Sequence, residues 1–307
     1  MGIRQTLRKV PPLERIRRAQ KFVSVVLANR HSPQAYPPGH YHSPIADLRQ
    51  VREDAQRAFA RDSRTLPGID LREDEQLELL EEFATYYPQV PWKDEAVPGL
   101  RYHFGNSWYE QSDAIFLYSM IRHANPSRIV EIGSGFSSAV TLDTNERFFG
   151  GSIKCSFIEP HPDRLLALLT EDDRSHVDLI KERLERVDLD IFRGLEAGDI
   201  LFIDSSHVAK VGSDVNHLFF ELLPILAVGV YIHIHDVFYP FEYPEEWVMR
   251  GFALNEDYML RAFLMFNEKF RVVAFNTYLE QFHEEWFRRN MPLCLKDRGG
   301  SLWLQVQ

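Results

Sequence analysis

The sequence is poor in cysteine, has no excess of positive charge and contains no long uninterrupted apolar run. Its two cysteines, Cys155 and Cys294, cannot build a disulfide framework, so we expect a reducing, cytoplasmic environment. The formal net charge of -10 argues against general nucleic-acid binding, because that activity requires a basic surface. The longest apolar stretch, residues 217–238, contains Glu221, Pro224 and Gly229. We therefore expect a helix, a break and a buried strand there, and no transmembrane segment.

The composition is that of a globular protein with enough apolar material for a packed core. Of the 307 residues, 45% are hydrophobic and 13% are aromatic. Helical patterns are predicted at about Pro12–Asn29, Ile45–Asp62 and Glu73–Tyr86. We therefore predict a mostly helical N-terminal region, or cap, over residues 1–100 and a second domain over residues 101–307. The helical region could form a dimer contact, so a homodimer remains open.

Strands and helices alternate in the second domain. Strands are predicted at Arg128–Ile132, Ile153–Ile158, Val177–Ile180, Asp199–Asp204, Gly229–His235, Arg271–Phe275 and Leu302–Val306. Helices are predicted from a capping box at Ser107 to just before Asn125-Pro126, at Ser137–Phe149, Asp163–Leu169 and Asp214–Leu226, and around residues 259–266. This alternation predicts an α/β fold with a doubly wound, mostly parallel sheet. Ligands of such sheets bind at the carboxyl ends of the strands.

The sharpest local signal is a glycine turn between the first of these strands and the following helix. Residues 129–138 read Ile-Val-Glu-Ile-Gly-Ser-Gly-Phe-Ser-Ser. Gly133 and Gly135 permit unusual backbone angles and a close approach of ligand to backbone, and the helix start offers free N–H groups. A dinucleotide fingerprint would require a third Gly or Ala at position 138, where this chain has Ser138. Glu131, two residues before the turn, suits a cationic ligand better than a pyrophosphate.

A second carboxylate ends the next strand, in Phe157-Ile158-Glu159-Pro160. At this position Glu159 can accept hydrogen bonds from the hydroxyl groups of a ribose. Taken alone, Glu159 is as well explained as a solvated strand end. Together with the glycine turn it favours a ligand that carries both a ribose and an amino acid.

These two motifs resemble those of the class I S-adenosylmethionine-dependent methyltransferases. The resemblance covers residues 100–307 and implies a Rossmann-like sheet of seven strands, the last antiparallel. It implies S-adenosylmethionine as methyl donor, bound by Glu131, Gly133, Ser134, Gly135, Ser137, Glu159 and Asp204, with the adenine near residues 181–183. The stretches 206–217, 261–267 and 299–304 also resemble a bacterial group of small-molecule O-methyltransferase-like proteins.

Candidate catalytic groups follow the fourth and fifth strands. Asp204, His207 and Lys210 follow the fourth, and His235 and Asp236 end the fifth. Neighbouring carboxyl ends should bring Asp204 and Asp236 together. His207 and His235 are the candidate bases that remove the acceptor proton, and Lys210 is an alternative orienting group.

A divalent metal ion is a further expectation at the same strand ends. Asp204 and Asp236 suit Mg²⁺ or Mn²⁺, whereas ligation by His207 or His235 would shift the preference toward Mn²⁺, Fe²⁺ or Zn²⁺. The pair resembles the metal site of catechol-type O-methyltransferases, which have Asp-Asn after the fifth strand. This chain has Asp236-Val237, so one ligand of that pattern is missing.

The sequence thus predicts an S-adenosylmethionine-dependent methyltransferase that acts on a small molecule, with a hydroxyl oxygen as the favoured acceptor. An N-methyltransferase acting on a small amine, which would need no metal, is an alternative. A donor-binding protein without turnover is another. A nicotinamide-dependent oxidoreductase is the most distant reading.

Overall fold

The computed structural model describes residues 35–307, so the helix predicted at Pro12–Asn29 lies outside the described residues. The chain divides into two compact units, Met1–Asp54 and Ala55–Gln307. In the described part of the first unit the only helix is α3 (Leu48–Glu53), which begins after Asp47, whose carboxylate accepts a hydrogen bond from the Arg49 N–H. The sequence prediction had placed the division near residue 100. No helix formed by residues 35–307 combines the length and apolar character needed to cross a membrane.

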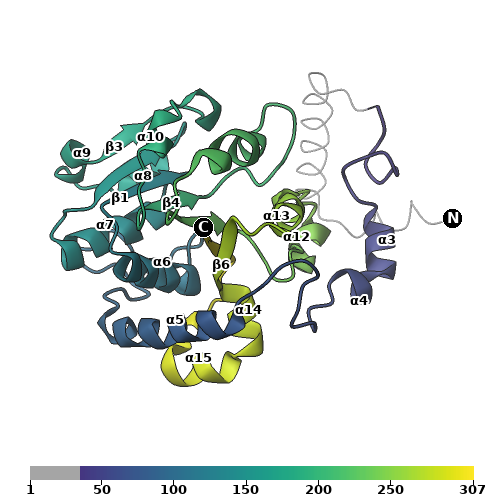
Figure 1. Cartoon of the computed structure of the whole chain (residues 1–307), viewed down its shortest axis with the longest axis horizontal. Helices are drawn as coiled ribbons and strands as arrows, with labels where there is room; N and C mark the ends of the chain where they lie inside the picture. The colour runs from purple at the N-terminus through teal and green to yellow at the C-terminus, as the bar shows by residue number, and fades with distance from the viewer. Residues whose placement is uncertain (1–34) are drawn as a thin grey trace, which may run out of the picture. The chain divides into compact units, whose positions relative to one another are not determined.

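The second unit is built on one seven-stranded sheet, coloured teal to yellow in Figure 1, with the order β3-β2-β1-β4-β5-β7-β6. The strands are β1 (Arg128–Ile132), β2 (Lys154–Ile158), β3 (Asp178–Ile180), β4 (Ile200–Ile203), β5 (Tyr231–His235), β6 (Phe270–Phe275) and β7 (Ser301–Val306). Strands β1 to β5 pair in parallel, and β7 runs antiparallel to both β5 and β6. The expected seven-stranded sheet with an antiparallel last strand is confirmed. The strand order reverses between β1 and β4, where ligands of such sheets bind.

Helices surround this sheet, and each predicted strand lies within two residues of its expected bounds. The helices of the second unit are α4 (Ala55–Ala58), α5 (Glu73–Tyr86), α6 (Gln111–Ala124), α7 (Phe136–Phe149), α8 (Asp163–Leu168), α9 (Asp173–His176), α10 (Asp190–Arg193), α11 (Asp214–His217), α12 (Glu245–Arg250), α13 (Glu256–Leu264), α14 (Asn276–Phe282) and α15 (Glu284–Asn290). Strands β4 and β5 are buried along their whole length, as expected for central parallel strands.

Two helix predictions are corrected by local chemistry. The capping box at Ser107 is wrong: α6 begins at Gln111, because the Asn106 side chain accepts the N–H groups of Trp108 and Tyr109 and holds this stretch as a turn. The helix predicted at Asp214–Leu226 is α11 followed by a π-helical turn, Leu218–Leu222, and a 3-10 turn, Leu223–Ile225. Pro224 in the last turn has no N–H to continue the α-helical bonding.

The sequence patterns gave no sign of α9, α10, α12, α14 and α15. Helix α15 lies beside α5 at one end of the unit (Figure 1), where Trp286 Nε1 donates a hydrogen bond to Glu81 at 2.6 Å. Helix α5 thus belongs to the second unit, and its Gln76 side chain accepts the Phe275 N–H at the end of β6.

A buried carboxylate joins the segment before α6 to helix α7. Asp143 of α7 is fully buried and accepts hydrogen bonds from Trp92 Nε1 at 2.8 Å and from the N–H groups of Arg101 and Tyr102 at 3.0 Å. Arg101 Nη1 lies 3.0 Å from the same carboxylate, and its Nη2 lies 2.6 Å from Asp173. This network fixes residues 92–102 against the first βα unit.

Candidate active site

The glycine turn after β1 packs directly on the end of β4. Gly133 has φ +77°, and a Cβ added there would lie 2.0 Å from the carbonyl oxygen of Asp204. Only glycine adopts this left-handed backbone conformation readily and also fits where there is no room for a side chain. The same contact sets the distance between the turn and Asp204.

Glu131 lies beneath this turn and organises the start of α7. Its side chain is fully buried, and Oε1 accepts hydrogen bonds from the hydroxyls of Ser137 at 2.6 Å and Ser138 at 2.8 Å. The Ser138 hydroxyl in turn accepts the N–H of Gly135 at 3.0 Å. Glu131 therefore shapes the turn from below.

Glu159 shapes the same turn from the β2 side. Its carboxylate accepts the N–H of Ser134 at 3.2 Å and the N–H of His161 at 2.7 Å. A cavity of about 360 Å³ opens beside it. The lining residues come from the ends of β1, β2 and β4 and the loops after β3 and β4: Ile132, Gly133, Ile158, Glu159, Pro160, Arg183, Leu184, Glu185, Asp204, Ser205, Ser206, Lys210, Gly212, Ser213 and Asp214. We call this the donor cavity.

A larger cavity, of about 1040 Å³, opens on the other side of Asp204. It is lined by Arg61, Ser107, Trp108, Glu110, Asp113, Arg164, Asp204, His207, His235, Asp236, Phe238, Pro244, Trp247, Arg250, Phe252, Leu254, Thr277, Gln281, Asp297, Arg298, Gly299 and Gly300. We call this the acceptor cavity. Asp204 lines both cavities, so a group bound in one can meet a group bound in the other at this side chain.

Four candidate residues converge where the cavities meet. His207 Nε2 lies 3.3 Å from Asp204 Oδ1 and 3.4 Å from Asp236 Oδ2. His235 Nε2 lies 3.6 Å from Asp236 Oδ1. On its other side His207 Nδ1 is hydrogen-bonded to Glu256 at 2.8 Å. The structure therefore brings together the ends of β4 and β5 as expected and adds Glu256 of α13, for which the sequence held no signal.

The backbone is strained at this point. His207 has φ +57° and Asp236 has φ +55°, in the left-handed region that non-glycine residues seldom adopt. Such conformations cost on the order of 1–3 kcal/mol each and concentrate at functional sites. Here they turn both side chains toward the junction of the two cavities.

Comparison with known proteins places these features in one family. Residues 130–237 match the sequence model of a family described as a methyltransferase domain. An uncharacterized protein of Archaeoglobus fulgidus is 35% identical over 185 residues, which cover 58% of this chain and 83% of the archaeal protein. The matched region runs from β1 to the residue after Asp236, so it contains both glycines of the turn, Glu159 and Asp204.

Residues 130–237 of this chain form a methyltransferase domain of that family.

Solved structures that resemble the methyltransferase are distant in sequence. The S-adenosylhomocysteine-bound methyltransferase PaMTH1 of Podospora anserina is 15% identical, with a TM-score of 0.42, over 89% of this chain and 99% of that chain. The O-methyltransferase TomG of Streptomyces achromogenes, in complex with S-adenosylmethionine, is 14% identical, with a TM-score of 0.41, over 85% and 96%. The fold assignment rests on the sheet order of the methyltransferase itself.

Charges at the junction of the two cavities of the methyltransferase neutralise one another. Burial by itself lowers the pKa of His207, but hydrogen bonds to Asp204 and Glu256 and the charge of Asp236 outweigh it and raise that pKa well above 6.5. Burial raises the pKa of Asp204, and contact with the two imidazoles outweighs it, so the net shift is downward. Burial raises the pKa of Asp236, and the imidazoles oppose this only in part. Asp204 is therefore the more acidic carboxyl and Asp236 the more basic.

The other residues that the sequence suggested for catalysis or donor binding do not lie at this junction. Lys210 lines the donor cavity and not the acceptor cavity, so its ammonium does not face a bound acceptor. Ser134 is buried, and its hydroxyl has no hydrogen-bond partner among residues 35–307. Arg183 borders the donor cavity, in the region where the sequence placed the adenine.

The side chains at the junction are of types that bind a divalent cation, but they are not positioned as a complete set of metal ligands. Within residues 35–307 there is no group of three or more His, Cys, Asp or Glu side chains set to hold a metal ion. Two carboxylates and two imidazoles nevertheless face one another, and Glu256 orients His207 as outer carboxylates orient metal-ligating histidines. A cation at Asp204 and Asp236 would replace the proton of His207 as their counter-charge. The metal stays a prediction.

Glu131 gives the methyltransferase a specific dependence of stability on pH. Burial raises the pKa of its carboxyl to about 8, against the hydrogen bonds from Ser137 and Ser138. The folded protein thus keeps a proton that the unfolded chain releases near its ordinary value, so this stability is present at low pH and is lost as pH rises toward 8. We expect the thermal midpoint of Glu131→Gln, relative to wild type, to increase steadily from pH 5 to pH 8. Parallel pH profiles for the two proteins would contradict the assignment.

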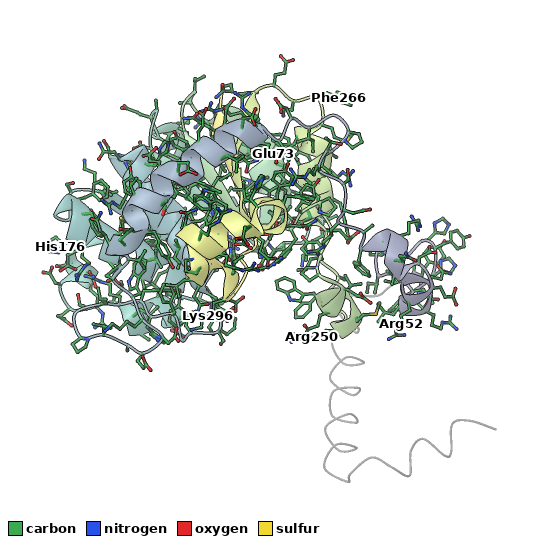
Figure 2. The ribbon with its side chains drawn as sticks, turned by 90° about the horizontal axis from the view of Figure 1, so that it is seen from below. Arg52, Glu73, His176, Arg250, Phe266 and Lys296 are labelled. Atoms are coloured by element: carbon green, nitrogen blue, oxygen red, sulfur yellow. The ribbon has the colours of Figure 1, made fainter. Side chains whose placement is uncertain are left out.

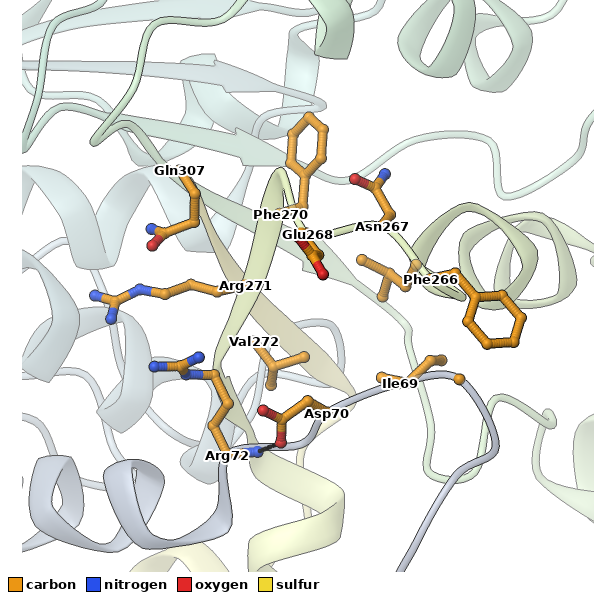
Figure 3. Close-up of a pocket in the computed structure, with 12 residues that line it drawn as sticks. Ile69, Asp70, Arg72, Phe266, Asn267, Glu268, Phe270, Arg271, Val272 and Gln307 are labelled. Atoms are coloured by element: carbon orange, nitrogen blue, oxygen red, sulfur yellow. Dashed lines mark hydrogen bonds between the residues drawn. The ribbon is translucent and has the colours of Figure 1, made fainter.

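A third cavity, of about 690 Å³, lies at the edge strand β6, far along the sheet order from β1 (Figure 3). Its two arginines, Arg72 and Arg271, extend along the same side of the cavity in Figure 3. Arg72 is ion-paired with Glu75, and Arg271 lies 3.6 Å from the same carboxylate. Both arginines of this cavity are thus paired with Glu75, and the cavity lies away from the glycine turn.

Proposed function

We propose that the methyltransferase moves the methyl group of S-adenosylmethionine to a hydroxyl oxygen of a small-molecule acceptor. The observation that supports this best is the shared position of Asp204, with the more basic carboxyl of Asp236 close by on the acceptor side. A methyl donor held at the glycine turn and an acceptor hydroxyl beside Asp236 would meet at this point.

In the proposed reaction the acceptor oxygen attacks the methyl carbon in line with the breaking carbon–sulfur bond. The electron pair of that bond stays on sulfur, which leaves as the neutral thioether of S-adenosylhomocysteine. The hydroxyl proton passes to Asp236, whose raised pKa makes it the stronger base of the two carboxylates. His207, held by Glu256, supplies the fixed positive charge between them. His235 is the second candidate for receiving the proton.

We further propose that a divalent cation, Mg²⁺ or Mn²⁺, assists this methyl transfer. Asp204 and Asp236 would hold it, with an imidazole of His207 or His235 as a further ligand. When bound, such an ion lowers the pKa of a coordinated hydroxyl. No further step of the proposal depends on it.

Calorimetric titration with S-adenosylhomocysteine, first with EDTA and then with added Mn²⁺, tests both the binding of the donor and the binding of the metal ion. We expect micromolar binding of S-adenosylhomocysteine in EDTA and a separate heat on adding Mn²⁺. The variant Asp236→Asn keeps a residue type that tolerates the left-handed backbone, so it should lose the Mn²⁺ heat and retain S-adenosylhomocysteine binding.

The outcomes separate the parts of the proposal. No binding of S-adenosylhomocysteine under any condition would end the methyltransferase assignment of this site. Binding without a Mn²⁺ heat would remove the metal and leave the imidazoles as the only counter-charges. Methylation of amines but not of hydroxyls in a subsequent acceptor screen would overturn the choice of oxygen.

A further inference from the structure

Arg61 brings a positive charge into the acceptor cavity without a carboxylate partner. Its side chain is partly buried and lines the cavity, and Nη2 donates to the backbone carbonyl of Glu242 at 3.3 Å. No carboxylate among residues 35–307 lies within ion-pair distance of it. Burial lowers the pKa of Arg61, and the more distant charges of Glu242 and Asp257 do not restore it. A guanidinium removed from water and left unpaired is a site for an anion.

The acids nearest to Arg61 are engaged elsewhere. The Glu242 carboxylate accepts the hydroxyl of Tyr258 at 2.6 Å, and Asp257 accepts the N–H of Phe238 at 3.2 Å. Asp257 Oδ1 has no hydrogen-bond partner among residues 35–307, but Asp257 does not lie within ion-pair distance of Arg61.

The segment that carries Arg61 is fixed to the walls of the cavity. Gln281 Nε2 of α14 donates to the Arg61 carbonyl, and the Tyr239 hydroxyl donates to the Ser63 carbonyl at 2.5 Å. Because these bonds hold the backbone at and just after the arginine, and its Nη2 donates to the Glu242 carbonyl, the charge is in place before a ligand arrives. Such preorganisation lowers the entropic cost of binding.

The other arginines of the cavity differ from Arg61. Arg298 is ion-paired with Glu284 at 2.6 Å, and Arg250 lies 3.6 Å from Glu246. Arg250 ends α12 at the periphery of the unit, where 62% of its side chain is exposed (Figure 2). Arg164 stacks over the ring of Trp108, 3.7 Å from its centroid. Arg61 alone among these four combines burial with an open charge.

The acids of the cavity have hydrogen-bond or charge partners other than Arg61. Asp113 accepts hydrogen bonds from Asn276 Nδ2 at 2.8 Å and from the Gly300 N–H at 3.1 Å. The charges of Asp204 and Asp236 face the His207 imidazole, as described above. A hydrogen bond with Asp297, together with burial, raises the pKa of Glu110 to about 7.

Aromatic side chains supply the rest of the recognition surface. Phe238 and Trp247 meet edge to face at 5.2 Å, Trp247 and Phe252 lie 5.8 Å apart, and Trp108 lines the same cavity. Rings of this kind favour a flat apolar ligand. Together, the aromatic walls and the unpaired arginine describe a ligand that has a flat ring system and an anionic group.

We propose that Arg61 forms an anion subsite of the acceptor cavity and that the acceptor is a planar aromatic acid, bearing a carboxylate as well as the hydroxyl that is methylated. This inference rests on the proposed function, because it assumes that the acceptor occupies this cavity. Arg61 acts here as a specificity-determining residue and takes no part in methyl transfer.

A pair of matched probes tests the subsite by calorimetry at pH 7.5 on full-length protein saturated with S-adenosylhomocysteine. The probes are 6-hydroxy-2-naphthoate and its neutral amide, 6-hydroxy-2-naphthamide. Wild-type protein should bind the carboxylate at least about 10-fold more tightly than the amide, the size expected for a charge-assisted hydrogen bond. Arg61→Gln should bind the two probes equally, and Arg61→Lys should keep part of the preference because it keeps the charge. Arg193→Gln, which removes an exposed arginine that does not line the acceptor cavity, is the control and should keep the full preference.

Several outcomes would overturn the subsite. Equal affinity of wild-type protein for the two probes, or undetectable binding of both, would do so, as would an unchanged preference in Arg61→Gln. The S-adenosylhomocysteine affinity and thermal midpoint of each variant are measured on the same samples. If S-adenosylhomocysteine itself does not bind, the proposed function fails first, and this result is distinct from failure of the anion subsite.

Discussion

Replacing Gly133 with alanine is expected to lower the affinity for S-adenosylhomocysteine by about 100-fold or more, equivalent to at least ~2.7 kcal/mol. The added Cβ would lie 2.0 Å from the Asp204 carbonyl oxygen, and φ is +77°, so the turn must move away from β4. That movement would separate the residues that line the donor cavity. The measurement is calorimetric titration of the variant with S-adenosylhomocysteine.

Gly151→Ala is the matched control for this prediction. Gly151 has nearly the same backbone angle, φ +76°, but a Cβ there would meet no atom within 4 Å. Its substitution should cost about 1–2 kcal/mol of folding stability through the left-handed backbone alone and leave the affinity unchanged. Near-wild-type affinity in Gly133→Ala would mean that the close packing of the turn on Asp204 is not needed for the donor.

The second large effect concerns stability. Asp143→Asn is expected to lower the free energy of unfolding by about 3–5 kcal/mol, because it removes one of the two buried carboxylates that hold Arg101. The asparagine amide would also face some of the donors, Trp92 Nε1 and the Tyr102 N–H, that the carboxylate now accepts. Chemical denaturation monitored by tryptophan fluorescence measures the change.

Glu146→Gln makes the same chemical change on an exposed partner of the same arginine. Glu146 lies 2.8 Å from Arg101 Nη1, but 63% of its side chain is exposed, whereas that of Asp143 is fully buried. Its replacement should cost less than about 1 kcal/mol, as is usual for exposed ion pairs. Equal losses in the two variants would show that burial does not set the strength of this network.

The parallel strands and the glycine turn were predictable because their signals are local. Strand β1 lies at the predicted Arg128–Ile132, since a short apolar run bounded by a glycine turn has few alternatives. The role of Glu159 in donor binding stays a prediction, made because it follows a strand in a sheet whose ligands bind at that edge. Helix starts were harder to predict, as the Asn106 turn before α6 shows, because a side chain outside the helix determines where it begins.

By itself, the sequence determined the sheet, the glycine turn and the acids at the strand ends, because each depends on residues that are neighbours along the chain. Only the tertiary structure decided which groups meet. Glu256 reaches His207 across 49 positions, and Gln281 holds Arg61 across 220. Packing between distant segments also places Asp204 in the lining of both cavities. It likewise leaves Arg61 without a carboxylate at ion-pair distance within residues 35–307. Contacts of this kind leave no period or motif in a single sequence, since the free energy that forms them comes from burial of the whole core.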